Sequence, residues 1–288
     1  MQLLTKELVA SWLPVRPVDG HKGTFGRVLI VGGCVGYSGA PVLSSRAAVR
    51  GGTGLVFLGV PKSVWPVAAV KSEEAMPFPL PEDEAGRLTE AAAELILQKL
   101  RGCDAGLIGP GLGQSEKLDE LVLAVLEGAN CPMVADADGL NALSRHMDRL
   151  SHITCPLILT PHDGEFQRLS GRWPDRNREE TALRFAEEHH CILVLKGHRT
   201  LIAAPDGRLF QNTTGNHGMA KGGSGDVLAG LTVSLLAQGM EPAEAAAAAV
   251  WCHGRAGDYA AQSKGFRGMT PGDLVEMLPR VWKEDLHC

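Results

Sequence analysis

The sequence lacks the cysteine patterns of disulfide-rich and zinc-binding proteins. Its 288 residues include seven cysteines, which form no Cys-x-x-Cys pair, no zinc-ligand spacing and no even set for disulfide pairing. Such cysteines are typical of the reduced thiols of a cytosolic protein. No stretch holds 18 apolar residues without charges, and the N-terminus lacks the pattern of a secretory leader. We therefore expect a soluble, cytoplasmic protein with no membrane partner.

A basic excess is absent as well. The formal net charge is −5 at pH 7, whereas nucleic-acid-binding domains usually carry a strong positive charge. We therefore expect no nucleic-acid partner. The Walker A pattern G-x-x-x-x-G-K-[ST] is also missing, which excludes a P-loop nucleotide site. With 44% hydrophobic and 21% charged residues, the chain can nevertheless bury a substantial core.

Short apolar runs alternate with longer helical patterns along the chain. The runs predict strands at residues 27–31, 54–60, 105–109, 133–138, 157–160, 192–196 and 200–204. Helical spacing covers residues 39–51, 88–100, 116–126, 179–189, 226–238 and 242–261. This alternation predicts an α/β fold with a central, mainly parallel sheet flanked by helices on both faces. We find no composition break, so we expect residues 1–288 to form a single domain, with a mobile loop at residues 78–87.

The run GMAKGGSGDVLAG at residues 218–230 is the strongest candidate for a site. Gly222, Gly223 and Gly225 surround Ser224 and lead to Asp226, where an apolar helical pattern begins. Successive glycines let backbone N–H groups approach a ligand closely, and the N-terminus of the following helix favours negative charge. The run therefore predicts a phosphoryl-binding turn with a catalytic acid or base. The structural alternative is that Asp226 only caps the helix.

Other turns follow predicted strands, at the sheet edge where parallel α/β proteins bind ligands. They are GGCVGYSGAP (32–41), GPGLG (109–113), DADGLNAL (136–143) and TPHDGEF (160–166). The first does not fit the dinucleotide-binding fingerprint, because its glycine order differs and no acidic residue follows about twenty positions on. KGHRT (196–200) joins two short strands, and its lysine and amides could lie over nucleotide phosphates, although a plain hairpin shows the same pattern.

Residues 20–72 contain no aspartate or glutamate. They do contain six basic residues: Lys22, Arg27, Arg46, Arg50, Lys62 and Lys71. Such a segment is either a solvated basic face or a positive region that suits an anionic ligand such as a nucleotide. Since two glycine-rich turns accompany it, we favour the anionic ligand.

The ordered set of motifs resembles one known family over most of the chain. HKGTFGRVLIVGG, YSGAP, GPGLG, DADGL, TPHDGEF, KGHRT and MAKGGSGDVLAG, between about residues 21 and 271, look like the ADP- or ATP-dependent NAD(P)H-hydrate dehydratase family. The resemblance implies a ribokinase-like fold. It also implies repair of the S form of NADH or NADPH hydrate, in which water has added across the nicotinamide ring. Phosphoryl transfer from ADP or ATP turns the hydroxyl into a phosphate, whose departure regenerates NADH or NADPH.

The resemblance also implies partners and cofactors. Mg2+ would accompany the nucleotide, and a stand-alone chain favours ADP as the donor. Some relatives carry an epimerase domain ahead of this one, but only some twenty residues precede the motifs here. We therefore expect no N-terminal epimerase domain and a functional partnership with a separate NAD(P)H-hydrate epimerase. The family further suggests a homo-oligomer, often a tetramer.

Residue roles follow from the resemblance by position. Asp226 would be the base that accepts the proton of the substrate hydroxyl. The amides of Gly222, Gly223, Ser224 and Gly225 would form the anion hole. The remaining contacts would be Ala40, Gly113, His162 and Asp226 for the substrate; Lys196, Gly197, His198, Arg199, Thr200 and Gly225 for the nucleotide; and Glu165, through water, for Mg2+.

Two other functions remain open. The first is a small-molecule kinase of the same fold, which would release a stable phosphorylated product. The second is a nucleotide sensor without chemistry, in which Asp226 would be dispensable. TPHDGEF and YSGAP favour the dehydratase over the kinase.

Overall fold

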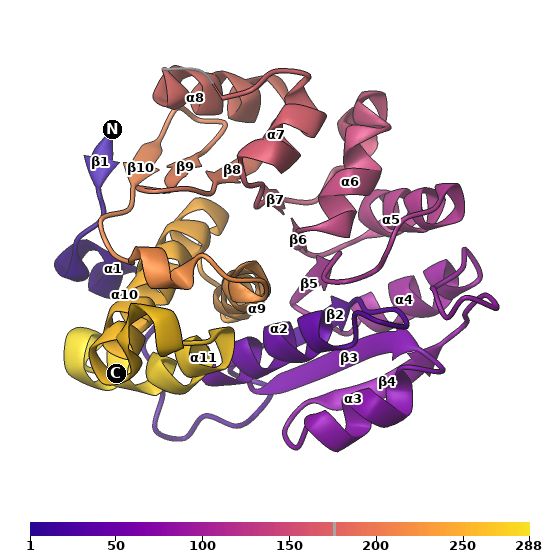
Figure 1. The fold of residues 1–288 in the computed structure, drawn as a ribbon, viewed down its shortest axis with the longest axis horizontal. Helices are drawn as coiled ribbons and strands as arrows, with labels where there is room; N and C mark the ends of the chain where they lie inside the picture. The colour runs from indigo at the N-terminus through magenta and orange to yellow at the C-terminus, as the bar shows by residue number, and fades with distance from the viewer. Residues whose placement is uncertain (175–176) are drawn as a thin grey trace.

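The computed structural model describes residues 1–174 and 177–288. Within them, ten strands form one sheet in the order β1-β10-β9-β8-β7-β6-β5-β2-β3-β4 (Figure 1). Neighbouring strands are parallel, except that β9 is antiparallel to both β8 and β10. The bounds are β1 Gln2–Leu3, β2 Arg27–Val31, β3 Leu55–Pro61, β4 Met76–Leu80, β5 Ala105–Ile108, β6 Met133–Ala135, β7 Leu157–Leu159, β8 Ile192–Leu195, β9 Leu201–Ala203 and β10 Leu209–Gln211.

Helices cover both faces of the sheet because successive strand residues point to opposite sides. In β2, Val28 and Ile30 belong to one buried cluster, and Leu29 and Val31 to the other. The first face packs against α1 (Lys6–Trp12), α2 (Gly39–Arg50), α3 (Trp65–Lys71), α9 (Ser224–Ala237), α10 (Pro242–Gly268) and α11 (Pro271–Arg280). The second packs against α4 (Ala92–Leu100), α5 (Glu116–Gly128), α6 (Asp138–Ser144), α7 (Asp163–Ser170) and α8 (Arg178–Glu188). Short 3-10 turns at Met147–His152 and His217–Met219 and a π-helical turn at Val281–Leu286 complete the elements.

The strand order creates a switch point between β2 and β5. The chain continues from β2 through β3 to β4 at one edge, and β5 then pairs on the opposite side of β2. In open α/β sheets, ligands bind at the carboxyl ends of the strands beside such a point. The turns that follow β2 and β5 meet there, where the Gly33 amide donates to the Pro110 carbonyl at 2.8 Å.

Strand β4 forms one edge of the sheet. The Lys62 amide donates to the Leu80 carbonyl at 3.1 Å, so the backbone of Leu80 faces β3. Pro77 and Pro79 alternate with the residues that face β3, and therefore face outward. The expectation of a loop over residues 78–87 is wrong for 78–80, because proline lowers the strand signal but is tolerated on an edge. The remaining residues, 81–87, contact the loop after β2, where the Val35 amide donates to the Gly86 carbonyl at 3.2 Å.

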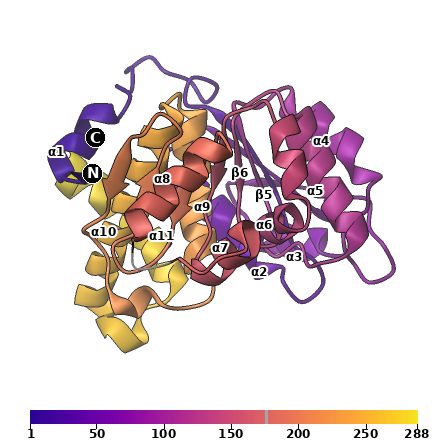
Figure 2. The same ribbon diagram turned by 90° about the horizontal axis from the view of Figure 1, so that it is seen from above.

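The predicted fold class is confirmed. Helices α1 and α10 lie at one end of the molecule and α4 and α5 at the other in both views (Figures 1 and 2). Elements that the sequence pattern did not predict are short or peripheral, namely α1, α3, α6, α7, α11, β1, β4 and β10. In the part of the chain that the structure describes, no helix has the length and apolarity to cross a membrane.

Candidate active site

The glycine-rich turn opens helix α9. Gly223 has a left-handed backbone (φ 101°), and α9 begins at the next residue, with Asp226 in its first turn. A Cβ atom at Gly223 would lie 2.8 Å from Leu43 Cδ1, so only glycine fits without strain. Asp226 is not the N-cap, since Gly223 holds that position. The left-handed Gly223 fixes the path of the chain into α9, and within the turn the Ser224 amide donates to the Lys221 carbonyl at 3.2 Å.

Two carboxylates and one ammonium group meet beside this turn. Lys196 follows β8, and its Nζ lies 3.0 Å from Asp136 Oδ1 and 3.5 Å from Glu165 Oε2. The carboxylates are nearly inaccessible, with side chains 3% exposed for Asp136 and 8% for Glu165. Although burial lowers the pKa of Lys196, the two carboxylates raise it more, so the amine stays charged.

Asp226 lies close to this cluster and is an unusually weak acid. Burial raises its pKa, and so does the negative charge of Asp136; Lys196 acts in the opposite sense, and the result is a pKa of about 7. An aspartate with this pKa exchanges its proton near neutral pH, which suits general base catalysis.

The predicted substrate contacts lie on the neighbouring turns. Ala40 lies beside the turn after β5, because a Cβ atom at Gly111 would be 3.2 Å from that of Ala40. The Gly113 amide donates to Asp138 Oδ2 at 2.9 Å. Ser44 Oγ donates to the Asp226 carbonyl at 2.9 Å and lies 3.3 Å from the Ala40 carbonyl. Ala40 and Asp226 are thus tied together, although 186 positions separate them in the sequence.

His162 and Glu165 form a capping box at the start of α7. His162 Nδ1 accepts from the Glu165 amide at 3.2 Å, and Glu165 Oε2 accepts from the His162 amide at 2.8 Å. The His162 side chain remains 57% exposed, so its ring is accessible to a substrate. The capping box fixes Glu165 in the cluster with Lys196.

Carboxylate oxygen is the donor type that Mg2+ prefers, so Glu165 fits a role at an Mg2+ ion. Among residues 1–174 and 177–288, however, no group of three or more His, Cys, Asp or Glu side chains is arranged to hold a metal. The described residues therefore do not enclose an ion by themselves, and an Mg2+ ion bound here would take most of its ligands from phosphates and water.

The turn at residues 196–200 presents two different surfaces. Lys196 points inward to the cluster, while Gly197, His198 and Arg199 are exposed. Thr200 Oγ1 lies 3.3 Å from the Gly197 amide and 3.1 Å from its carbonyl, which closes the turn. The structure therefore brings Lys196 together with Gly225, and leaves His198 and Arg199 on the solvent side.

Sequence patterns missed three polar residues of the site: Ser44, Asp136 and Thr160. Thr160 Oγ1 donates to Asp136 Oδ1 at 2.7 Å, and both residues are buried. Asp136 and Thr160 stood in turns that the pattern singled out, so strand ends carried a signal for them. Ser44 had none, since it lies inside a predicted helix.

Three of the basic residues in segment 20–72 do not support the expected anion site. Arg46 and Arg50 pair with Glu276 on α11 at 2.8 and 3.5 Å. Arg27 begins β2, at the end of the strand opposite to the turns. A segment without acidic residues in the sequence can still face an acidic residue in the fold, because Glu276 of α11 packs against this one.

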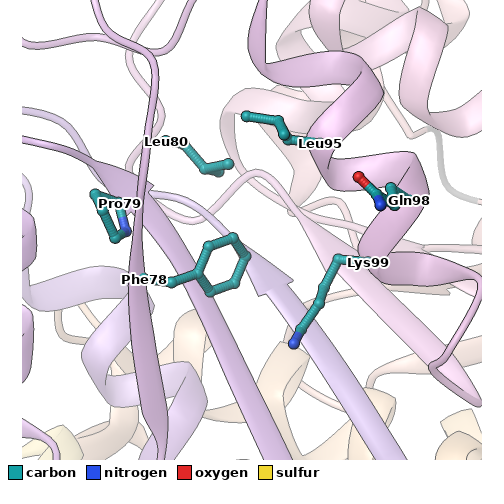
Figure 3. Close-up of a pocket in the computed structure, with 6 residues that line it drawn as sticks. All are labelled: Phe78, Pro79, Leu80, Leu95, Gln98 and Lys99. Carbon is teal, nitrogen blue, oxygen red and sulfur yellow. The ribbon is translucent and has the colours of Figure 1, made fainter.

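A surface pocket of about 370 Å3 lies away from the glycine turn, between β4 and α4 (Figure 3). Phe78, Pro79 and Leu80 line it from the strand, and Leu95, Gln98 and Lys99 from the helix. Lys99 Nζ also sits 3.6 Å from the ring centre of Phe57, so its charge is already engaged. No carboxylate and no glycine-rich turn is among the described residues that line this pocket, and we do not assign the activity to it.

A mainly parallel sheet, with a glycine turn and a helix N-terminus at its carboxyl edge, defines a ribokinase-like α/β protein. Residues 28–280 match the family model of NAD(P)H-hydrate dehydratase. The chain belongs to this family.

Similar proteins agree with this assignment. The chain is 45% identical to the bifunctional NAD(P)H-hydrate repair enzyme Nnr of Moorella thermoacetica, over 97% of this chain and 53% of that protein. It is 34% identical to the ADP-dependent (S)-NAD(P)H-hydrate dehydratase of Bacillus subtilis, over 97% of both chains. The structure of the Bacillus subtilis ADP/ATP-dependent enzyme co-crystallised with ATP and Mg2+ superposes with a TM-score of 0.82 at 31% identity, covering 99% of this chain and 98% of that one. The chain spans about half the length of the first curated relatives it matches.

Proposed function

We propose that this protein dehydrates the S form of NADH or NADPH hydrate in a reaction that consumes ADP, or ATP, as phosphoryl donor. The observation that carries the proposal is Asp226, with a pKa of about 7, in the first turn of α9 behind the glycine turn. Family membership and the name of the Bacillus subtilis relative support the substrate and favour ADP.

In the first step, the hydroxyl oxygen of the hydrate attacks the terminal phosphoryl group of the nucleotide. Asp226 accepts the hydroxyl proton, an O–P bond forms, and the bond to the rest of the nucleotide breaks. The amides from Gly222 to Gly225 and the Lys196 ammonium stabilise the charge on the transferring group. Mg2+, when bound, supplies further charge neutralisation, and Glu165 would hold it through water.

In the second step, phosphate leaves together with a ring proton, and the dihydronicotinamide is restored. Phosphate is a far better leaving group than hydroxide, which is why a dehydration consumes a nucleotide. Ala40, Gly113 and His162 would contact the hydrate. The turn from Lys196 to Thr200 would contact the nucleotide, together with Gly225. Gly113 and His162 lie in the loops after β5 and β7, and Ala40 lies in the first turn of α2, all at the same edge of the sheet as Asp226.

Other properties extend this proposal. We propose that residues 1–288 act as one domain in a cytoplasmic homo-oligomer, such as a tetramer, and that a separate epimerase converts the other form of the hydrate. The name of the Moorella thermoacetica relative, a bifunctional repair enzyme about twice as long as this chain, supports a second activity that works with this one. Light scattering of the purified protein measures the oligomeric state.

The test is recovery of dihydronicotinamide absorbance from NADH hydrate with Mg2+ and either ADP, ATP or no nucleotide. The proposal expects recovery only with a nucleotide, and none in Asp226→Asn, which should still bind the nucleotide in calorimetry. Glu284→Gln, a change at an exposed carboxylate in the C-terminal π-helical turn, is the matched control and should keep full turnover. A stable phosphorylated product in the mass spectrum would indicate the kinase instead, and nucleotide binding without any turnover would indicate a sensor.

A further inference from the structure

Asp136 is a buried carboxylate to which the proposed reaction gives no role. It follows β6, and only 3% of its side chain is exposed. Its Oδ1 accepts from Thr160 Oγ1 at 2.7 Å and from Lys196 Nζ at 3.0 Å. Burying a carboxylate is costly without such partners, so Thr160 and Lys196 make this buried position tolerable for Asp136.

The backbone around Asp136 holds the side chain in place. Its amide donates to the Ile108 carbonyl at 3.2 Å, and its carbonyl accepts from the Gly139 amide at 2.9 Å. A Cβ atom at Gly109 would lie 1.8 Å from the Asp136 carbonyl oxygen, so the two strand ends touch directly. The next residue, Ala137, has φ 51°, a strained value for a residue with a side chain. These contacts fix the backbone of Asp136, and the bonds to Thr160 and Lys196 orient its carboxylate.

The free oxygen of Asp136 faces the start of α9. Its Oδ2 lies 3.8 Å from the position of a Cβ atom on Gly225, and Lys196 Nζ lies 3.3 Å from that position. Because Gly225 has no side chain, nothing from this residue stands between the cluster and the helix that carries Asp226. Four charged groups act on Asp226 from the surrounding elements: Asp136 after β6, Glu165 on α7, Asp138 on α6 and Lys196 after β8.

We propose that Asp136 is a positioning residue of this site, which holds Lys196 under the glycine turn and keeps a fixed negative charge beside Asp226. This inference rests on the proposed function, because it assigns the purpose of the charge to Asp226 as a base. With Asp136 charged, a proton binds Asp226 more tightly than it binds an ordinary aspartate. Asp226 is then strong enough as a base to take the hydroxyl proton at neutral pH.

The first experiment titrates Asp226 directly in the nucleotide-free and metal-free protein, by carbon NMR of aspartate-labelled samples. The signal that disappears in Asp226→Asn identifies the residue. In Asp136→Asn, the pKa of Asp226 should fall by roughly one unit, because one like charge is lost while the opposing charge of Lys196 stays. Asp136→Ser provides a second neutral variant if the first does not fold.

Thr160→Val is the matched control. It removes a hydrogen bond to Asp136 but leaves its charge, so the pKa of Asp226 should stay within a few tenths of a unit of the wild-type value. An unchanged pKa in a folded Asp136→Asn protein would overturn the inference. So would a shift of equal size in Thr160→Val, since that would assign the effect to packing rather than to charge.

The second experiment measures kcat/KM against pH with saturating nucleotide. The acid limb should move to lower pH in Asp136→Asn and stay in place in Thr160→Val. Failure of the proposed function has different signatures: a wild-type protein that does not restore the dihydronicotinamide, or turnover that persists in Asp226→Asn. The NMR titration does not depend on turnover, and therefore tests Asp136 in either case.

Discussion

Replacing Gly225 with alanine separates the stability of this site from its chemistry. Gly225 is the second residue of α9 and has no left-handed backbone, so alanine can adopt its conformation. The new methyl carbon would lie 3.3 Å from Lys196 Nζ and 3.8 Å from Asp136 Oδ2. The first contact is tight, but it involves the end of a flexible side chain that can retreat by a few tenths of an ångström. Alanine also favours a helix over glycine by about 1 kcal/mol, so the two effects offset each other.

We therefore expect the free energy of unfolding to change by less than about 1 kcal/mol. Activity should respond differently, because the methyl group occupies the space between the turn and Lys196 where the phosphoryl group is proposed to lie. A displacement of about 1 Å in a reacting group costs on the order of 100-fold in rate, and we expect a loss of that size in kcat/KM. Urea unfolding and the absorbance assay measure the two quantities.

Substitutions at two other glycines serve as comparisons for this result. Gly223→Ala forces a left-handed backbone on alanine and a 2.8 Å contact with Leu43, and should cost about 2 kcal/mol or more. Gly268→Ala meets nothing within 4 Å and should leave both stability and activity unchanged. Wild-type kcat/KM in Gly225→Ala would refute the reasoning, because the phosphoryl group would then have to lie elsewhere.

Three further outcomes follow from the structure. The pKa of Asp226 is about 7 in the folded protein and 3.8 ordinarily, so ionisation of this side chain opposes folding as the pH rises. Asp226→Asn should therefore be more stable than the wild type at pH 8, by up to about 4 kcal/mol. Thermal unfolding should show that this advantage disappears toward pH 4. Gly230→Ala places a carbon 2.1 Å from the Ser44 carbonyl oxygen and should destabilise the protein by about 3 kcal/mol in urea unfolding. Arg178→Ala removes a guanidinium 3.4 Å from the Lys196 carbonyl and should raise the KM for nucleotide by roughly 3- to 10-fold, a change of about 1 kcal/mol, with kcat nearly unchanged.

Much of the fold could be predicted because its signals are local. Parallel strands buried on both faces are continuous apolar runs, and β2, β5 and β8 are such runs. The edge strand β4 was not predicted, because it is only partly buried and two prolines interrupt its apolar run. Helix α9 was found almost in full, and it starts two residues before the predicted position.

The candidate site likewise has a part that local sequence predicts and a part that it does not. The glycine turn and Asp226 are adjacent in sequence, so backbone chemistry alone indicated them. The ion pair of Asp136 with Lys196 joins residues 60 positions apart, and the hydrogen bond from Ser44 to Asp226 spans 182. Only the strand order brings these groups together. The same limit explains the misjudged basic segment, since Glu276 reaches Arg46 from 230 positions away.

The two outward prolines of β4 have a consequence for how this molecule meets other copies of itself. An exposed edge strand normally offers alternating donors and acceptors, and so acts as a template for a foreign strand. Here Pro77 and Pro79 leave the rim with carbonyl acceptors but no amide donors at those positions, and the indole of Trp65 already caps the Pro77 carbonyl at 3.1 Å. The opposite rim, β1, is only two residues long. The sheet is therefore protected at both margins against growth by strand addition, and any assembly of this protein must use its helices and loops.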